Sequence, residues 1–310
     1  MKKLFIIIVV FYSLLCQGQQ NVNYSNYLDN SFYLNPAVAY LGKKSLNIIY
    51  RNQWNGFEGA PKTTFISYQS SILNKKDVKT SSFSNIGGFI QNEDIGAFRS
   101  FKINISYSYS FLLSSNWRLS FGSFFGIQQL GLDVTNVSLF DPNDPVLDVS
   151  NFTLLPDFSL GFTITNNNNF FGISAKQVLE NNWEKIINSE LSQNESSVVF
   201  IAAKKIPLRN IGFTPNIMLD FTGKFKPKLI AGLKIHYKEV LSTGIAIRNE
   251  NSILGQLKIN VTNNLQITYA HDFFLFPNIL LSPLNSSEFM VSYISSVIEN
   301  NKHKNSISFF

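Results

Sequence analysis

The stretch KINISYSYSF, Lys102–Phe111, alternates polar and apolar residues over its whole length. Ile103 and Tyr107 fall in the apolar phase, while Lys102 and Asn104 fall in the polar one. Successive side chains of a β-strand point to opposite faces, so this pattern predicts a strand with one apolar and one polar face. The fold therefore depends on whether the apolar face meets a protein core or lipid.

The composition of the chain favours lipid. Charged residues make up 15% of the 310 residues, well below the roughly 25% of an ordinary soluble domain. Hydrophobic residues reach 45%, with 29 Phe and 12 Tyr, which is typical of a protein whose outer surface is not entirely in water. The net charge is +6, but Lys and Arg form no clustered stripe, so nucleic acid is not an expected partner.

The first residues predict export. Lys2 and Lys3 precede an apolar run, Leu4–Leu15, which is too short to span a bilayer and has the length of a signal-peptide core. We expect a cleavable signal peptide at residues 1–18, which removes the single cysteine, Cys16. Further on, no apolar run approaches 18 residues, so a helical membrane protein is not expected.

Period-two patterning continues through most of the remaining chain and predicts about fourteen strands. Each is close to the 9–11 residues that a tilted strand needs to cross a bilayer. The expected strands are Ser45–Trp54, Lys62–Ile72, Phe83–Gln91, Phe98–Leu113, Trp117–Asp133, Leu154–Thr165, Phe170–Gln177, Ser196–Pro207, Phe213–Thr222, Pro227–Tyr237, Val240–Arg248, Ser252–Val261, Leu265–Asp272 and Glu288–Ser295. The predicted fold class is all-β: a closed antiparallel transmembrane β-barrel at residues 45–296, preceded by a periplasmic segment at residues 19–44.

The lengths of the connections support a barrel over a soluble β-sandwich or an extracellular solenoid, the alternatives that alternation alone leaves open. The three longest links, Val134–Thr153, Val178–Glu195 and Phe273–Ser287, all fall on one side of the predicted sheet. Most links on the other side are short, although Leu73–Ser82 is an exception. Short periplasmic turns and longer outer loops are typical of outer-membrane barrels.

In a barrel, the polar phase of each strand should face the lumen. The candidate lumen-facing residues are Lys102, Asn104, Lys234, His236, Arg248, Gln256 and Lys258. The chain shows no metal-ligand spacing, phosphate-binding loop or nucleophile elbow, so we expect neither a cofactor nor enzymatic activity.

Two stretches, FYLNPAVAY (Phe32–Tyr40) and YRNQWNGFEGAPKT (Tyr50–Thr63), resemble the N-terminal signature of the PorP/SprF family of type IX secretion system outer-membrane proteins, found in Bacteroidetes. Later segments such as SEFMVSY (Ser287–Tyr293) also resemble the family. The family usually ends just after this strand, so residues 297–310 are either a tail or part of a re-registered last strand.

The motif residues have two interpretations: a hairpin that holds the barrel shape, or a docking surface for a partner. They are Asn35, Pro36, Tyr50, Arg51, Asn52, Gln53, Trp54, Gly56, Gly59, Ala60, Pro61 and Lys62. The resemblance implies a non-enzymatic role in secretion, surface attachment or gliding-adhesin delivery, with outer-membrane lipid, the C-terminal signal domain of a secreted cargo and other secretion components as partners. The rival hypothesis is a porin or a transporter of hydrophobic or anionic small molecules.

Overall fold

The computed structural model describes residues 22–38, 42–72, 82–114, 116–133, 152–179, 195–223, 227–238, 240–249, 251–275 and 285–297. The expected signal peptide and most of residues 297–310 lie outside these ranges. Within them, no helix is long and apolar enough to cross a membrane.

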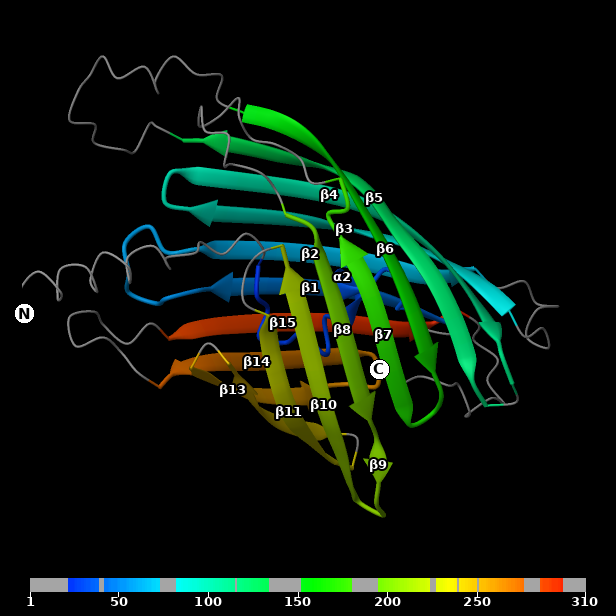
Figure 1. Cartoon of the computed structure of the whole chain (residues 1–310). Helices are drawn as coiled ribbons and strands as arrows, with labels where there is room; N and C mark the ends of the chain where they lie inside the picture. Colours follow the sequence, from blue (N-terminus) through cyan, green and yellow to red (C-terminus); the bar gives the residue numbers. More distant parts are fainter. Residues whose placement is uncertain are drawn as a thin grey trace, which may run out of the picture.

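The described chain is one antiparallel sheet that closes on itself (Figure 1). Its strands are β1 Lys43–Asn52, β2 Lys62–Ile72, β3 Ser82–Ile95, β4 Phe98–Leu112, β5 Arg118–Leu132, β6 Phe152–Thr165, β7 Asn169–Lys176, β8 Ser197–Lys204, β9 Ile206–Pro207, β10 Ile211–Thr222, β11 Lys228–Tyr237, β12 Leu241–Arg248, β13 Ser252–Asn260, β14 Leu265–Phe274 and β15 Ser286–Ser296. The two-residue β9 and β8 both pair with β10, one after the other, and together they count as one strand of the barrel wall. The wall therefore has fourteen strands. A closed fourteen-stranded barrel is the fold class that the sequence predicted.

Closure joins the two ends of the sheet. β1 pairs with β15 over ten residues, from Lys43 opposite Ser296 to Asn52 opposite Ser287. A bilayer interior offers no hydrogen-bond partners, so an unpaired edge would cost several kcal/mol for each unsatisfied backbone group. The β1–β15 ladder removes that cost.

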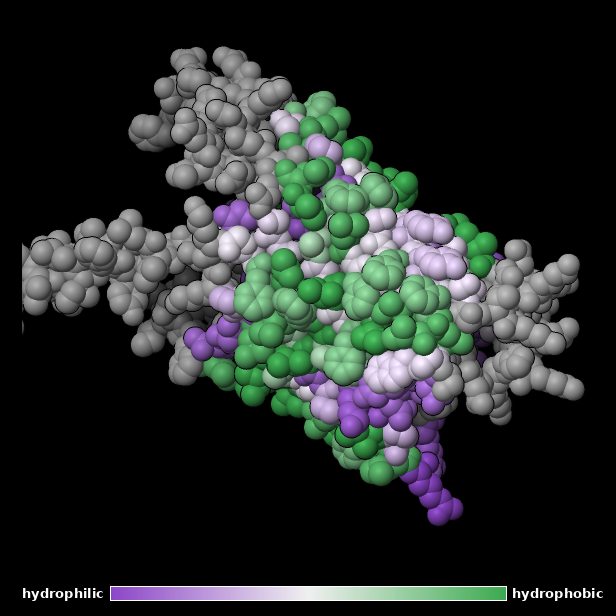
Figure 2. All heavy atoms as spheres, turned by 45° about the vertical axis from the view of Figure 1, so that its right-hand side comes forward, coloured by the Kyte–Doolittle hydropathy of each residue, from purple (hydrophilic) through white to green (hydrophobic). Residues whose placement is uncertain are grey.

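The side chains show an inverted burial pattern. In β4, Lys102, Asn104 and Ser106 are buried, whereas Ile103 and Ile105 on the opposite face are exposed. Figure 2 shows the outward apolar side chains as a broad hydrophobic surface over the strands. A soluble protein buries the opposite set, so this surface is suited to hydrocarbon.

Most outward tyrosines lie toward one end of the wall, and Tyr50 near the other end is an exception. Tyr68, Tyr107, Tyr237 and Tyr293 are all about half exposed, and each lies in the half of its strand nearer the short turns. Amphipathic rings favour the boundary between lipid and water. The links after β5, β7 and β14 are the longest and lie at the opposite end, which we take as the outer end.

Candidate functional site

The interior of the barrel is occupied by residues Val22–Val38, which we call the plug. It is irregular except for one turn of helix, α2 Ser31–Leu34, and its side chains are almost all buried. It contacts strands around the whole circumference, including β3, β6, β10, β11 and β15. Only a segment inside the barrel can do so, and in Figure 1 it lies in blue between the front and rear strands.

The plug runs along the barrel axis. Near its start, Asn23 accepts a hydrogen bond of 3.1 Å from Lys228 Nζ, at the outer end of β11. Beyond the last residue of the plug, Gly42 donates a backbone hydrogen bond to Ser71 Oγ at the periplasmic end of β2. Residues 19–44 were expected to be a periplasmic segment, but the structure places Val22–Val38 within the lumen. The physical reason is that the lumen supplies the polar and aromatic partners that these side chains need.

A buried ionic cluster, which we call the latch, holds the outer half of the plug. Arg51 on β1 lies 2.9 Å from Asp272 on β14 and 3.3 Å from Glu288 on β15, and all three side chains are at most 2% exposed. Glu288 accepts backbone hydrogen bonds from Ser25, at 2.7 Å, and from Asn26, at 3.1 Å. The latch therefore binds the plug backbone itself to the seam where the barrel closes.

A second ionic group surrounds Asp29, the single charged residue of the plug. Its carboxylate lies 2.6 Å from Lys234 Nζ and 3.3 Å from Lys258 Nζ, and it also accepts a hydrogen bond from Gln256. Burial alone would raise the pKa of Asp29, but the two ammonium groups outweigh it and hold this pKa below its ordinary value. Asp29 therefore stays ionised and neutralises part of the basic wall of the lumen.

The opposite side of the plug is aromatic. Tyr33 packs edge-on against Phe65 of β2 and Phe89 of β3, with ring centroids 5.5 and 5.6 Å apart. Lys176 Nζ lies 4.0 Å from the Tyr33 ring centroid, a cation–π contact. Burial raises the pKa of the Tyr33 hydroxyl well above its ordinary value, so it stays neutral. The plug thus has one face for the ionic half of the wall and another for its aromatic half.

The family residues Asn35 and Pro36 fix the periplasmic half of the plug. The Asn35 amide donates hydrogen bonds to the carbonyl oxygens of Phe162, at 3.1 Å, and Ile173, at 3.0 Å. Pro36 crosses so close to β5 that a Cβ on Gly122 would lie 2.4 Å from its carbonyl oxygen. Glycine in the wall therefore makes room for the plug backbone.

The remaining motif residues build the outer hairpin between β1 and β2. Gln53 donates its backbone N–H to the Pro61 carbonyl, and Trp54 has a φ of 52°. Asn55 joins the hairpin to the neighbouring loop through the Asn285 carbonyl. Most hairpin residues of the motif lie at the rim of the barrel and are partly or fully exposed: Asn52, Gln53, Trp54, Gly56, Gly59, Ala60 and Lys62. Pro61 is buried, and the Tyr50 side chain faces outward. The docking interpretation therefore concerns the rim, because Arg51, Asn35 and Pro36 lie inside.

The seven residues expected in the lumen all belong to the inward phase of their strands. Lys234, Gln256 and Lys258 contact Asp29. Arg248 lies 3.5 Å from Asp272 in the latch. Lys102 and Asn104 both contact Asp157. The two ring nitrogens of His236 lie 2.9 Å from the hydroxyl oxygens of Thr214 and Ser242.

Sequence reasoning missed the acidic half of this site. Asp272 was the last residue of one expected strand and Glu288 the first residue of another, so neither stood inside a clear alternation. Asp29 lies in a segment without periodicity. A usable signal was present, because the inward phase of the predicted strands holds several basic residues, and basic groups that become buried require counter-charges. Among the described residues, no group of His, Cys, Asp or Glu could hold a metal ion.

A closed, fourteen-stranded barrel with an apolar exterior and a filled polar interior defines an outer-membrane β-barrel protein. The chain belongs to the PorP/SprF family, because the model of the type IX secretion system membrane protein PorP/SprF matches residues 16–293. No curated protein matches its sequence significantly.

Two solved structures share the fold at low sequence identity. The Ralstonia pickettii toluene transporter TbuX is 8% identical, with a TM-score of 0.53, over 86% of this chain and 93% of that chain. The CymD monoaromatic hydrocarbon channel is 10% identical, with a TM-score of 0.51, over 86% of this chain and 92% of that chain. At such identities the likeness concerns the fold alone.

Proposed function

We propose that this protein supports the secretion or surface attachment of a partner protein as a closed outer-membrane component of the type IX secretion system. Family membership supports the system. The observation that carries the role is the plug, which is bonded to strands around the barrel and fills its lumen. A secreted protein would then dock on this barrel and not pass through it.

The rim hairpin is the proposed docking surface for the C-terminal signal domain of the cargo. Phe57 at its tip is 51% exposed, and Gly56 and Gly59 beside it have positive φ angles of 90° and 73°. These glycines fix a turn that keeps the aromatic ring outside the wall. The hairpin is also tied to the loop before β15 through Asn55, which limits its movement.

Site-specific photo-crosslinking in cells tests this proposal. A photoreactive residue at Phe57 should crosslink to a secreted protein, whereas the same residue at Lys238, in the exposed turn after β11 at the periplasmic end, should not. Deletion of the gene should leave that secreted protein inside the cell or unattached. Export and anchoring of every surface protein in the deletion strain would contradict the proposal.

The second candidate is a small-molecule transporter. It is favoured by the basic inward residues and by the fold shared with a toluene transporter and a hydrocarbon channel. Planar-bilayer recordings and toluene uptake by proteoliposomes separate the two roles. Stable ion-selective conductance or saturable uptake by the intact protein would favour transport, and neither is expected while the plug is in place.

A further inference from the structure

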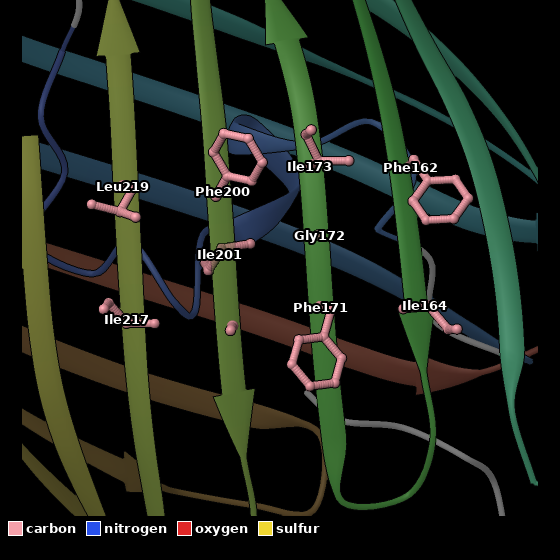
Figure 3. A pocket seen from close by; sticks show the side chains of 10 residues that line it. Phe162, Ile164, Phe171, Gly172, Ile173, Phe200, Ile201, Ile217 and Leu219 are labelled. Carbon is pink, nitrogen blue, oxygen red and sulfur yellow. The ribbon is translucent and has the colours of Figure 1, made fainter. Parts of the chain in front are cut away.

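A hollow of about 400 Å³ lies on the wall at β6, β7, β8 and β10 (Figure 3). Its lining is entirely apolar: Phe162, Ile164, Phe171, Gly172, Ile173, Phe200, Ile201, Ala202, Ile217 and Leu219. Most of these side chains belong to the outward phase of their strands, and Phe171, Phe200 and Ile217 are each more than 40% exposed. The hollow therefore opens toward the bilayer and not toward the lumen.

The register explains the hollow. Figure 3 shows two rows of side chains across the four strands. The upper row is Phe162, Ile173, Phe200 and Leu219, and the lower row is Ile164, Phe171, Ala202 and Ile217. Ala202 is the small member of the lower row, so Phe171 and Ile217 beside it, with Phe200 above, become the walls of a slot.

A cation lies just beyond the slot on the same face. Lys204 follows Ala202 by two residues, is exposed, and ends β8 toward the periplasm. At about 3.3 Å per residue, its Cα is roughly 7 Å from that of Ala202. Arg209 is also exposed in the turn between β9 and β10, which forms the hydrophilic lowest tip in Figure 2.

We propose that the slot binds a phospholipid of the periplasmic leaflet, with one acyl chain over Ala202 and the phosphate beside Lys204. An acyl chain provides the hydrocarbon contacts that the slot walls would otherwise lack. A phosphate near the boundary provides the counter-charge for an exposed ammonium group. The inference rests on the barrel and its orientation, and does not depend on the role in secretion.

The proposed site has two separable halves. Filling the slot by Ala202→Phe should remove the space for the chain while leaving an apolar, lipid-facing surface. Reversing the charge by Lys204→Glu should leave the slot intact and repel the phosphate. Thr243→Phe, on the outward face of β12, and Lys44→Glu, exposed at the periplasmic end of β1, are matched controls.

Native mass spectrometry of the detergent-purified protein, titrated with palmitoyl-oleoyl phosphatidylglycerol, tests the site. The wild type and both controls should retain one phosphatidylglycerol tightly, Lys204→Glu should bind it about tenfold more weakly, and Ala202→Phe should lose it. Diacylglycerol with the same chains should bind the wild type and Lys204→Glu equally.

Three results would overturn the proposal. Equal retention of phosphatidylglycerol by all variants would show that the lipid binds elsewhere. Lipid loss in the controls as large as in Ala202→Phe and Lys204→Glu would show a general effect on the annular lipid. Preferential retention of lipid A over phosphatidylglycerol would place the ligand in the other leaflet. Circular dichroism and heat-modifiable gel migration establish that each variant is folded.

Discussion

Arg51→Met should open the plug, because Arg51 is the cation that lies between two buried carboxylates of the latch. In the wild type its guanidinium contacts Asp272 at 2.9 Å and Glu288 at 3.3 Å, and it also donates to Ser25 Oγ. Met keeps much of the apolar volume of Arg but removes the charge. Asp272 and Glu288, which both accept hydrogen bonds from Ser25 of the plug, then lose the cation that they share.

The magnitude follows from what remains after the substitution. Removal of one partner of a buried ion pair costs roughly 3–5 kcal/mol. Arg248 still lies 3.5 Å from Asp272, and Glu288 still accepts two backbone N–H groups from the plug. We therefore expect the lower end, about 3 kcal/mol, which corresponds to a roughly hundredfold rise in the open fraction of the plug.

Planar-bilayer recordings measure this opening directly. Arg51→Met should show frequent conducting events, and adding Glu288→Gln should suppress part of the increase by removing one uncompensated charge. Arg99→Met is the control, because Arg99 forms comparably short ion pairs with Asp94 and Asp133 but at an exposed rim where they contribute little. Equal conductance for Arg51→Met and Arg99→Met would refute the assignment of the latch.

Three further predictions concern the plug. Deletion of Val22–Val38 should yield a folded barrel with steady conductance, and a silent bilayer would show that the plug does not block the lumen. Gly122→Ala should displace the plug near Pro36 and expose it to limited proteolysis, whereas Gly244→Ala, where a Cβ meets side-chain atoms no nearer than 3.2 Å, should not. The pKa of Asp29 is lower in the folded than in the unfolded protein, so its stabilisation is complete above the unfolded value of 3.8 and is lost as pH falls toward the lower folded pKa. The free energy of unfolding should therefore fall less below about pH 4 in Asp29→Asn than in the wild type.

The wall could be predicted from the sequence because one physical rule acts on every strand. Lipid requires an apolar residue at every second position of a membrane-spanning strand. The alternation in segments such as Lys102–Phe111 therefore shows which side chains face lipid and which face the lumen. The rule weakens where strands rise out of the bilayer. β3 was expected to end at Gln91, yet its ladder with β4 continues to Ile95, because Asn92, Glu93 and Asp94 are polar in both phases.

The plug could not be predicted in the same way, because no periodic constraint acts on it. Its buried residues depend on partners in the wall: Tyr24 donates a hydrogen bond to Gln91, and the Asn26 backbone donates one to Glu288. These contacts are determined by the closed barrel and not by local propensity. The family motif marked Arg51, Asn35 and Pro36 as important, but only the three-dimensional structure shows that Arg51 contacts the plug and that Asn35 and Pro36 belong to it.

Barrel closure and plug docking are coupled through the latch. Arg51 and Glu288 are direct cross-strand neighbours in the β1–β15 ladder, and Glu288 binds plug residues more than 260 positions away in sequence. Pairing of the first and last strands therefore places Arg51 beside the carboxylate that binds the plug. A buried Arg51 without the latch carboxylates would be an uncompensated charge, which disfavours a closed seam that lacks them. The latch thus couples plug docking to the seam. A ligand that withdraws the plug removes the hydrogen bonds of Ser25 and Asn26 to Glu288 and weakens the seam beside it, while the β1–β15 ladder still keeps the barrel closed.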